Sequence, residues 1–315
     1  MRQTLIRLLS RGSRERKPQR APRRPDVRPV VLAERIERTP AIDPAVQALS
    51  RTVVRAMPAG PRTDALHGVP FGQPAHPAIV RFPLGCWTSA VLLDLVPGTA
   101  RASRLLIGAG LAAVLPSAAT GLADWSALHR HQQRVGLVHA AAQGLAGAMF
   151  AASFGMRVAG RHRDGKLLSA TGLTALLAGT YLGGHLALRL GAGASHAEPI
   201  GHLADLGWQD LCPLSELPTG RLVRRQLGYL SLAVLRSGTD VYVLSDHCAH
   251  LGGPLHQGRV ADIDVTCPWH GSTFRLTDGA VVHGPATARQ PAFQTRVSET
   301  GLVQVRPLTA AVGDA

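Results

Sequence analysis

Two segments, CAHLGGPL (residues 248–255) and CPWHGSTF (residues 267–274), decide how the C-terminal part of this chain folds. Each segment pairs one cysteine with one histidine: Cys248 with His250, and Cys267 with His270. Glycine and proline follow each pair closely, and these residue types form tight turns. The spacing C-x-H-x16-C-x2-H therefore predicts two short loops that present two thiolates and two imidazoles to one metal centre.

Two kinds of metal centre use this ligand set. In one type of 2Fe-2S cluster, two thiolates hold one iron and two imidazoles hold the other, which raises the reduction potential. A tetrahedral zinc site can have the same four ligands. The Gly-Gly-Pro and Pro-Trp-His-Gly-Ser contexts are not needed to bind zinc, so the sequence favours the cluster. An iron assay and an absorbance spectrum separate the two.

Both segments resemble the cluster-binding loops of Rieske proteins, and the resemblance covers roughly residues 203–308. It implies four ligands of one 2Fe-2S cluster: the cysteines Cys248 and Cys267, and the histidines His250 and His270.

Rieske domains of cytochrome bc complexes carry two further cysteines, one in each loop, that form a disulfide. This chain has Gly253 and Trp269 in those places, so it looks like the Rieske ferredoxins and the ferredoxin-like domains of dioxygenases. We therefore expect a reduction potential near the low end of the Rieske range, at about −150 mV.

Short alternating segments such as YLSLAVLR and DVYVLSD fill residues 203–308, separated by glycine, aspartate and proline. This pattern predicts an all-β domain whose ligand loops lie at the tips of hairpins. The resemblance further implies that Gly284 and Pro285 form a third loop over the cluster.

Four apolar stretches precede this domain, each close to the ~20 residues that cross a hydrocarbon core. They cover residues 78–97, 105–123, 135–156 and 167–188. Gly179 and Gly183 form a G-x-x-x-G pair that favours close helix packing in lipid. The predicted fold is multi-domain, an N-terminal four-transmembrane-helix bundle followed by the all-β Rieske domain, with a soluble Ala/Gly-rich bundle as the alternative.

The segments GQPAHPAIVRFPLG, TGLADW, RVGLVHAAAQ and YLGGHLALRLG resemble an uncharacterised four-helix membrane domain that accompanies Rieske domains in bacteria. Gln73 and Gln143 depart from its usual histidine and asparagine. The expected domains are a basic, largely disordered arm (1–65), the membrane domain (66–193), a linker (194–202), the Rieske domain (203–308) and a tail (309–315).

The formal net charge of +14 is concentrated ahead of the Rieske domain. The Pro- and Arg-rich arm offers no folded basic face or aromatic platform for nucleic acid, so we expect it to lie near anionic membrane lipid. An amphipathic helix is expected at residues 43–57. Without a recognisable secretory signal, we expect a multi-pass protein of the bacterial plasma membrane, with the termini and the Rieske domain in the cytoplasm.

Four titratable side chains are expected at the membrane end that carries the Rieske domain: His76, Asp124, His139 and His185. Ionisable groups inside a bilayer are costly and usually functional. His139 and His185 could ligate a haem b, with Gly183 and Gly184 leaving room for the porphyrin. A quinone site, or hydrogen bonds between helices, are the alternatives.

The leading functional prediction is a membrane-anchored Rieske electron-transfer protein that passes single electrons between a donor and an acceptor, either redox proteins or a quinone. One alternative is a ferredoxin-like component of a multi-subunit oxygenase, and another is a cluster-based redox sensor. In each case the chain is an oxidoreductase component and electron carrier rather than a stand-alone catalyst.

Overall fold

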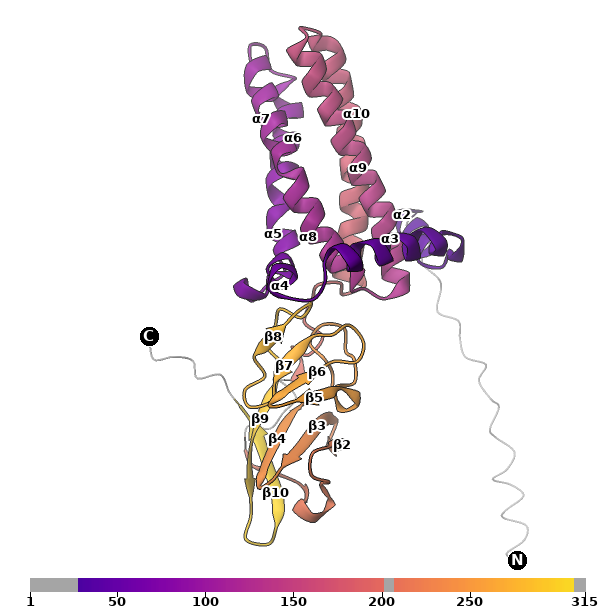
Figure 1. Cartoon of the computed structure of the whole chain (residues 1–315). Helices are drawn as coiled ribbons and strands as arrows, with labels where there is room; N and C mark the ends of the chain where they lie inside the picture. The colour runs from indigo at the N-terminus through magenta and orange to yellow at the C-terminus, as the bar shows by residue number, and fades with distance from the viewer. Residues whose placement is uncertain (1–27, 201–206, 309–315) are drawn as a thin grey trace, which may run out of the picture.

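The computed structural model describes residues 28–200 and 207–308 (Figure 1). The start of the expected arm (1–27), the end of the expected linker (201–206) and the tail (309–315) lie outside the described residues. A helical part and a β part are stacked end to end, and each has its own hydrophobic core.

The helices α5 to α10 form a bundle and run side by side in Figure 1. They are α5 (Ala75–Ile79), α6 (Arg81–Leu93), α7 (Ala100–Ala112), α8 (Val114–Ser126), α9 (Arg130–Val158) and α10 (His162–Gly184), which continues as a π-helical turn, η3 (His185–Arg189). Three helices are long and apolar enough to cross a membrane: Ala100–Ser126, Arg130–Val158 and His162–Arg189. They match the last three predicted spans.

The first predicted span is divided into α5 and α6, so the predicted number of four spans is not confirmed. The physical reason is Pro83, which has no N–H to donate to the carbonyl of Ile79 and so interrupts the helix near Val80. Pro116 acts in the same way where α7 passes into α8 at Ala113.

An aromatic pair holds the middle of the bundle together. The rings of Trp87 and Phe150 stack with centroids 4.4 Å apart, and Ile107 and Leu176 pack in the same buried cluster. Gly110 allows this approach, because a Cβ there would overlap the Trp87 indole. The small residues of the apolar segments thus let large rings from other helices fill the space between them.

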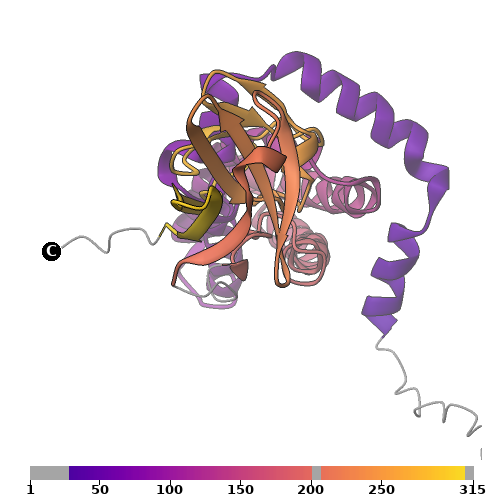
Figure 2. The same cartoon turned by 90° about the horizontal axis from the view of Figure 1, so that it is seen from below.

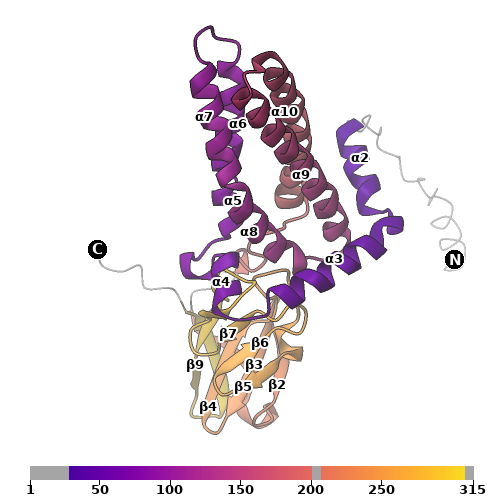
Figure 3. The ribbon, with the colours of Figure 1, turned by 45° about the horizontal axis from the view of Figure 1, so that its top comes forward.

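The described part of the predicted disordered arm is helical. It forms α2 (Arg28–Glu37), a 3-10 turn η1 (Pro40–Ile42), α3 (Asp43–Ala56) and α4 (Pro61–His67), followed by a second 3-10 turn η2 (Val69–Phe71). The expectation of disorder is therefore corrected for this region, and the expected helix at 43–57 is confirmed. Figures 2 and 3 show α2 and α3 at the side of the bundle.

Burial explains why these basic segments fold. Val46 and Val53 lie on one face of α3 and pack against Trp125. Arg134 of α9 donates to both carboxylate oxygens of Asp43, at 2.8 and 2.7 Å. The apolar contacts and this bidentate ion pair offset the conformational entropy that the chain loses when these helices form.

The β part contains two antiparallel sheets. The six-stranded sheet has the order β1 (Gln209–Pro213), β10 (Leu302–Pro307), β9 (Ala292–Val297), β4 (Asp240–Ser245), β3 (Leu230–Ser237) and β2 (Leu222–Leu227). The four-stranded sheet has the order β5 (Arg259–Ala261), β6 (Asp264–Thr266), β7 (Thr273–Arg275) and β8 (Val281–His283). Two 3-10 turns, η4 (Leu214–Glu216) and η5 (Leu255–Gln257), complete it. The predicted all-β domain is confirmed.

A carboxylate of the helical part binds the third loop of the β part. Asp64 of α4 accepts a hydrogen bond from the backbone N–H of Gly284 at 2.8 Å, and its other oxygen lies 2.9 Å from Nδ1 of His283. The four-stranded sheet therefore faces α4 and α8, as Figure 3 shows.

A buried ion pair lies at the opposite end of the bundle. The guanidinium of Arg157 is 1% exposed and binds both oxygens of Asp94, with Nη1 and Oδ1 2.8 Å apart. Ser153 and Ser169 satisfy further N–H groups of Arg157. The charge is thus compensated inside the apolar bundle.

We expect Asp94→Ala to lower the free energy of unfolding by about 3–5 kcal/mol, because it leaves the buried Arg157 charge without its partner. Unfolding of the detergent-solubilised chain by a denaturing detergent measures this change. Arg161→Ala is the control, because it breaks the exposed Arg161–Asp164 pair and should change the free energy by less than ~1 kcal/mol. Equal effects of the two substitutions would contradict the assignment.

Candidate metal centre

The two predicted ligand loops are tight turns at the end of the four-stranded sheet. In the first loop, the Cys248 N–H donates to Gly253 O at 2.9 Å, and the Gly252 N–H donates to Cys248 O at 2.8 Å. In the second, which joins β6 to β7, the Cys267 N–H donates to Ser272 O at 2.8 Å. Gly252 and Gly271 have φ angles of 74° and 80°, a region in which side chains are strained.

The loops bring the four predicted ligands together as two pairs. Cys248 and Cys267 are buried, and their side chains interact. This interaction lowers the pKa of Cys267, whereas the same interaction and burial raise the pKa of Cys248. The rings of His250 and His270 meet edge to face with centroids 5.1 Å apart.

Both histidines are neutral at physiological pH, as metal ligands must be. Burial, followed by the nearby charge of His270, lowers the pKa of His250 to about 3. Burial and the charge of His129 lower the pKa of His270 to about 4. The Nδ1 atom of His250 is buried without a hydrogen-bond partner, which is the state expected of an atom that coordinates a metal.

The pairwise arrangement fits a two-iron cluster. Across residues 28–200 and 207–308, no group of three His, Cys, Asp or Glu side chains is placed to hold one ion, as a tetrahedral zinc site would need. One thiol pair and one imidazole pair instead match a cluster in which each iron takes two protein ligands.

Position 253 requires glycine, because the two loops pack closely against each other there. A Cβ at this position would lie 2.8 Å from the sulfur of Cys267 and 3.1 Å from the indole of Trp269. The loops are therefore in contact where the sequence lacks the pair of disulfide-forming cysteines. Close packing of a glycine against an indole takes the place of a covalent link between the loops.

Side chains outside the motif hold the loops, and sequence reasoning missed them. The Gln290 amide donates to the carbonyls of Ser245 and His247 at 2.9 and 2.7 Å and accepts from the N–H of Ala249 at 2.8 Å. Gln290 is thus the main brace of the first loop. A lone glutamine in a coil segment carries no pattern that would have revealed it.

Asp246 is a second brace of the first loop. Its carboxylate accepts hydrogen bonds from the backbone N–H of His256 at 2.8 Å and from the Ser231 hydroxyl at 3.0 Å, and it contacts Nδ1 of His256. His256 therefore supports the loop through Asp246.

The helical part contacts the candidate ligands directly. The ring of His129, immediately before α9, meets the rings of Trp269 and His270 at centroid distances of 5.3 and 5.2 Å. Its backbone N–H donates to the side chain of Gln132 at 2.9 Å, and Gln132 in turn donates to Leu190 O at 2.9 Å. The start of α9 and the end of α10 thus hold His129 against the metal centre.

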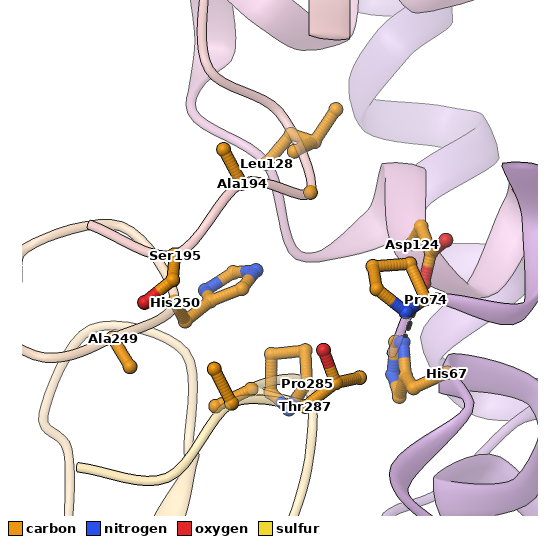
Figure 4. Close-up of a pocket in the computed structure, with 13 residues that line it drawn as sticks. His67, Pro74, Asp124, Leu128, Ala194, Ser195, Ala249, His250, Pro285 and Thr287 are labelled. Carbon is orange, nitrogen blue, oxygen red and sulfur yellow. Dashed lines mark hydrogen bonds and ion pairs between the residues drawn. The ribbon is translucent and has the colours of Figure 1, made fainter. Parts of the chain in front are cut away.

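A small cavity of about 40 Å³ lies between the two parts, beside the first ligand loop (Figure 4). His250 and Pro285 line it from the β part, and His67 and Asp124 line it from the helical part. His67 Nδ1 and Asp124 Oδ1 are 2.8 Å apart. The predicted third loop, at Gly284 and Pro285, therefore borders the cavity next to His250.

The four titratable side chains predicted near this membrane end each have a different hydrogen-bond partner. Asp124 pairs with His67, and His185 Nε2 lies 2.7 Å from Glu37 Oε1 of α2. His139 Nδ1 donates to Gly179 O at 2.7 Å, and His76 Nδ1 donates to Ser117 O at 3.0 Å. The structure thus places His139 and His185 on different partners. Glu37 was missed because its segment was expected to be disordered.

Two family profiles match this chain. The profile of the Rieske 2Fe-2S domain matches residues 207–295, and that of a predicted membrane protein family, DUF2231, matches residues 72–196. The first match contains all four candidate ligands, and the second contains the long helices α6 to α10.

The curated relatives reported next each match less than a third of this chain. Ferredoxin CarAc of Metapseudomonas resinovorans is 30% identical over 93 residues, which cover 29% of this chain and 87% of that protein. The ferredoxin subunit of 3-phenylpropionate/cinnamic acid dioxygenase of Escherichia coli (strain K12) is 30% identical over 77 residues, covering 24% of this chain and 72% of the subunit. Apoptosis-inducing factor 3 of Mus musculus is 26% identical over 89 residues, 28% of this chain, and the chain spans only 15% of its length.

Among solved structures, the complex of reduced oxygenase and oxidized ferredoxin in carbazole 1,9a-dioxygenase matches with 30% identity and a TM-score of 0.30, covering 32% of this chain and 94% of the matched chain. The match to ferredoxin CarAc over most of its length, together with the profile matches, shows that this chain belongs to the Rieske 2Fe-2S family and carries in addition a membrane domain of the DUF2231 family.

Proposed function

We propose that this chain is a membrane-anchored Rieske electron-transfer protein that passes single electrons between a donor and an acceptor. The observation that carries the proposal is the buried, unpartnered Nδ1 of His250 beside His270, above a hydrogen-bonded cysteine pair. These groups are poised for metal and have no other role in the described structure.

Cys248 and Cys267 would hold one iron of the cluster, and His250 and His270 would hold the other. When bound, the cluster accepts and returns one electron, mainly at the iron held by histidine. The chain supplies hydrogen-bond donors to the two sulfurs. Backbone N–H groups of His250 and Leu251 donate to the Cys248 sulfur, and those of Trp269 and His270 donate to the Cys267 sulfur. Such donors stabilise negative charge on the sulfurs.

The membrane domain is proposed to cross the bilayer four times, with α5 and α6 together as the first crossing. Ala75–Leu93 has about 19 residues, or roughly 28 Å at 1.5 Å per residue, close to the ~30 Å of a hydrocarbon core. Four crossings return the chain to the side on which it entered. This agrees with α4 and the segment after α10 both lying next to the β part in Figure 1.

We place the Rieske domain and both termini on the cytoplasmic side of a bacterial plasma membrane. All four cysteines are free, which suits a reducing compartment. We propose a membrane domain at residues 66–193, a linker at 194–202 and a Rieske domain at 203–308. The proposed Rieske domain encloses the matched segment 207–295. The proposed membrane domain covers the matched segment 72–196 up to residue 193. Lipid is then a permanent partner of the chain.

The donor and acceptor are proposed to be redox proteins or a quinone. The relatives include ferredoxins of dioxygenases, which favours an oxygenase component as the second candidate function. A quinone is the alternative, because the His67–Asp124 pair of the helical part faces His250 across the small cavity between the two parts. An imidazole–carboxylate pair there could take up the proton that accompanies the electron.

The ligand assignment is tested with His250→Leu and, as the matched control, His247→Leu, three residues away and exposed. We expect His250→Leu to abolish the electron paramagnetic resonance signal of the reduced cluster, because one iron loses a protein ligand. His247→Leu should keep the signal and about two irons per chain. Loss of the signal in the control alone, or its survival in His250→Leu, would refute the assignment.

The reduction potential is a second test. We expect about −150 mV by protein-film voltammetry, because the described donors to the cysteine sulfurs are backbone amides and the loops lack a disulfide. A potential above about +200 mV would contradict this prediction and would indicate a quinol-oxidising type of centre.

A further inference from the structure

Two histidines inside the helical part have the same hydrogen-bond pattern. His76 of α5 directs Nδ1 to the carbonyl of Ser117 at 3.0 Å, and His139 of α9 directs Nδ1 to the carbonyl of Gly179 at 2.7 Å. A carbonyl only accepts, so Nδ1 must carry the proton in both rings. In a neutral imidazole, Nε2 is then a bare acceptor with a free lone pair.

Neither Nε2 atom has a partner in the described structure, although both rings are largely enclosed by helices. Both histidines are half-buried, and a ring nitrogen without a partner at the depth of a bilayer is costly. A backbone carbonyl on the far side of a ring is the usual arrangement for a histidine that binds a metal through its other nitrogen.

The rings are held by glycines on the neighbouring helices. A Cβ at Gly121 of α8 would lie 2.7 Å from Cε1 of His76, and one at Gly183 of α10 would lie 3.0 Å from Cε1 of His139. Each ring therefore lies against the backbone of another helix and has little freedom to turn. The two rings are also within electrostatic range of each other.

From these contacts we propose that His76 and His139 are the two axial ligands of one haem b bound inside the membrane bundle. Two imidazoles alone do not complete the coordination of a free zinc or iron ion, and no group of three metal-binding side chains is found in the described residues. A porphyrin supplies the four equatorial nitrogens, so two histidines suffice.

The pair differs from the one that the sequence suggested. His139 is retained, but His185 contacts Glu37 through Nε2, the atom that would have to bind iron. His76 replaces it, because its Nε2 has no hydrogen-bond partner and its charge acts on His139. The proposal concerns a second cofactor and does not depend on the function proposed for the cluster.

The test uses the full chain, expressed in cells that make haem and purified in detergent. We expect a Soret band, and about one haem b per chain by the pyridine haemochrome assay. His76→Leu and His139→Leu should each remove the band, whereas His185→Leu, the matched control, should keep it. The resonance signal of the cluster should persist in all three variants, which shows that each is folded and separates this test from that of the cluster.

Absence of haem from the unaltered chain overturns the proposal. Loss of the Soret band in His185→Leu with its retention in His76→Leu also overturns it and favours the other pair.

A paired glycine experiment tests the position of the ring. Gly183→Ala places a methyl group 3.0 Å from His139 Cε1, so the ring must shift and haem occupancy should fall at least several-fold. Gly184→Ala is the control, because a Cβ there meets no atom within 4 Å. Equal haem content in the two variants would argue against His139 as a ligand held by Gly183.

Discussion

The structure depends on the close approach of two loops that place two thiols and two imidazoles side by side. Gly253 makes the approach possible, because any Cβ would enter the space of the Cys267 sulfur and the Trp269 ring. The loops are fixed from behind by Gln290 and Asp246, which take up backbone groups that the turns leave open. The ligands are therefore ordered by the protein, with the sheet as their rigid base.

The second constraint is the contact between the β part and the helical part. His129 lies against His270, and Asp64 binds Gly284 in the neighbouring loop. The histidine side of the centre consequently faces the membrane bundle and is covered by it. The bundle therefore restricts access to the His270 edge of the centre.

The sequence predicted the parts whose chemistry is local. The spacing of Cys248, His250, Cys267 and His270 predicted the four side chains that the fold brings together, and alternation predicted the β domain. Contacts distant in the chain were not predictable. Glu37 pairs with His185 and Asp94 with Arg157, and neither pair leaves a periodic pattern. The helix at Arg28–Glu37 was missed because the Pro- and Arg-rich composition of the arm favoured disorder, whereas the amphipathic helix expected at residues 43–57 is present as α3.

The central claim is that the four loop residues hold a two-iron cluster at the membrane end of the β part. The most direct measurement is the metal content of the detergent-purified chain, taken together with its resonance spectrum before and after reduction by dithionite. The account predicts about two irons per chain and a rhombic signal that appears only on reduction. A colourless protein with one zinc per chain and no signal would contradict it.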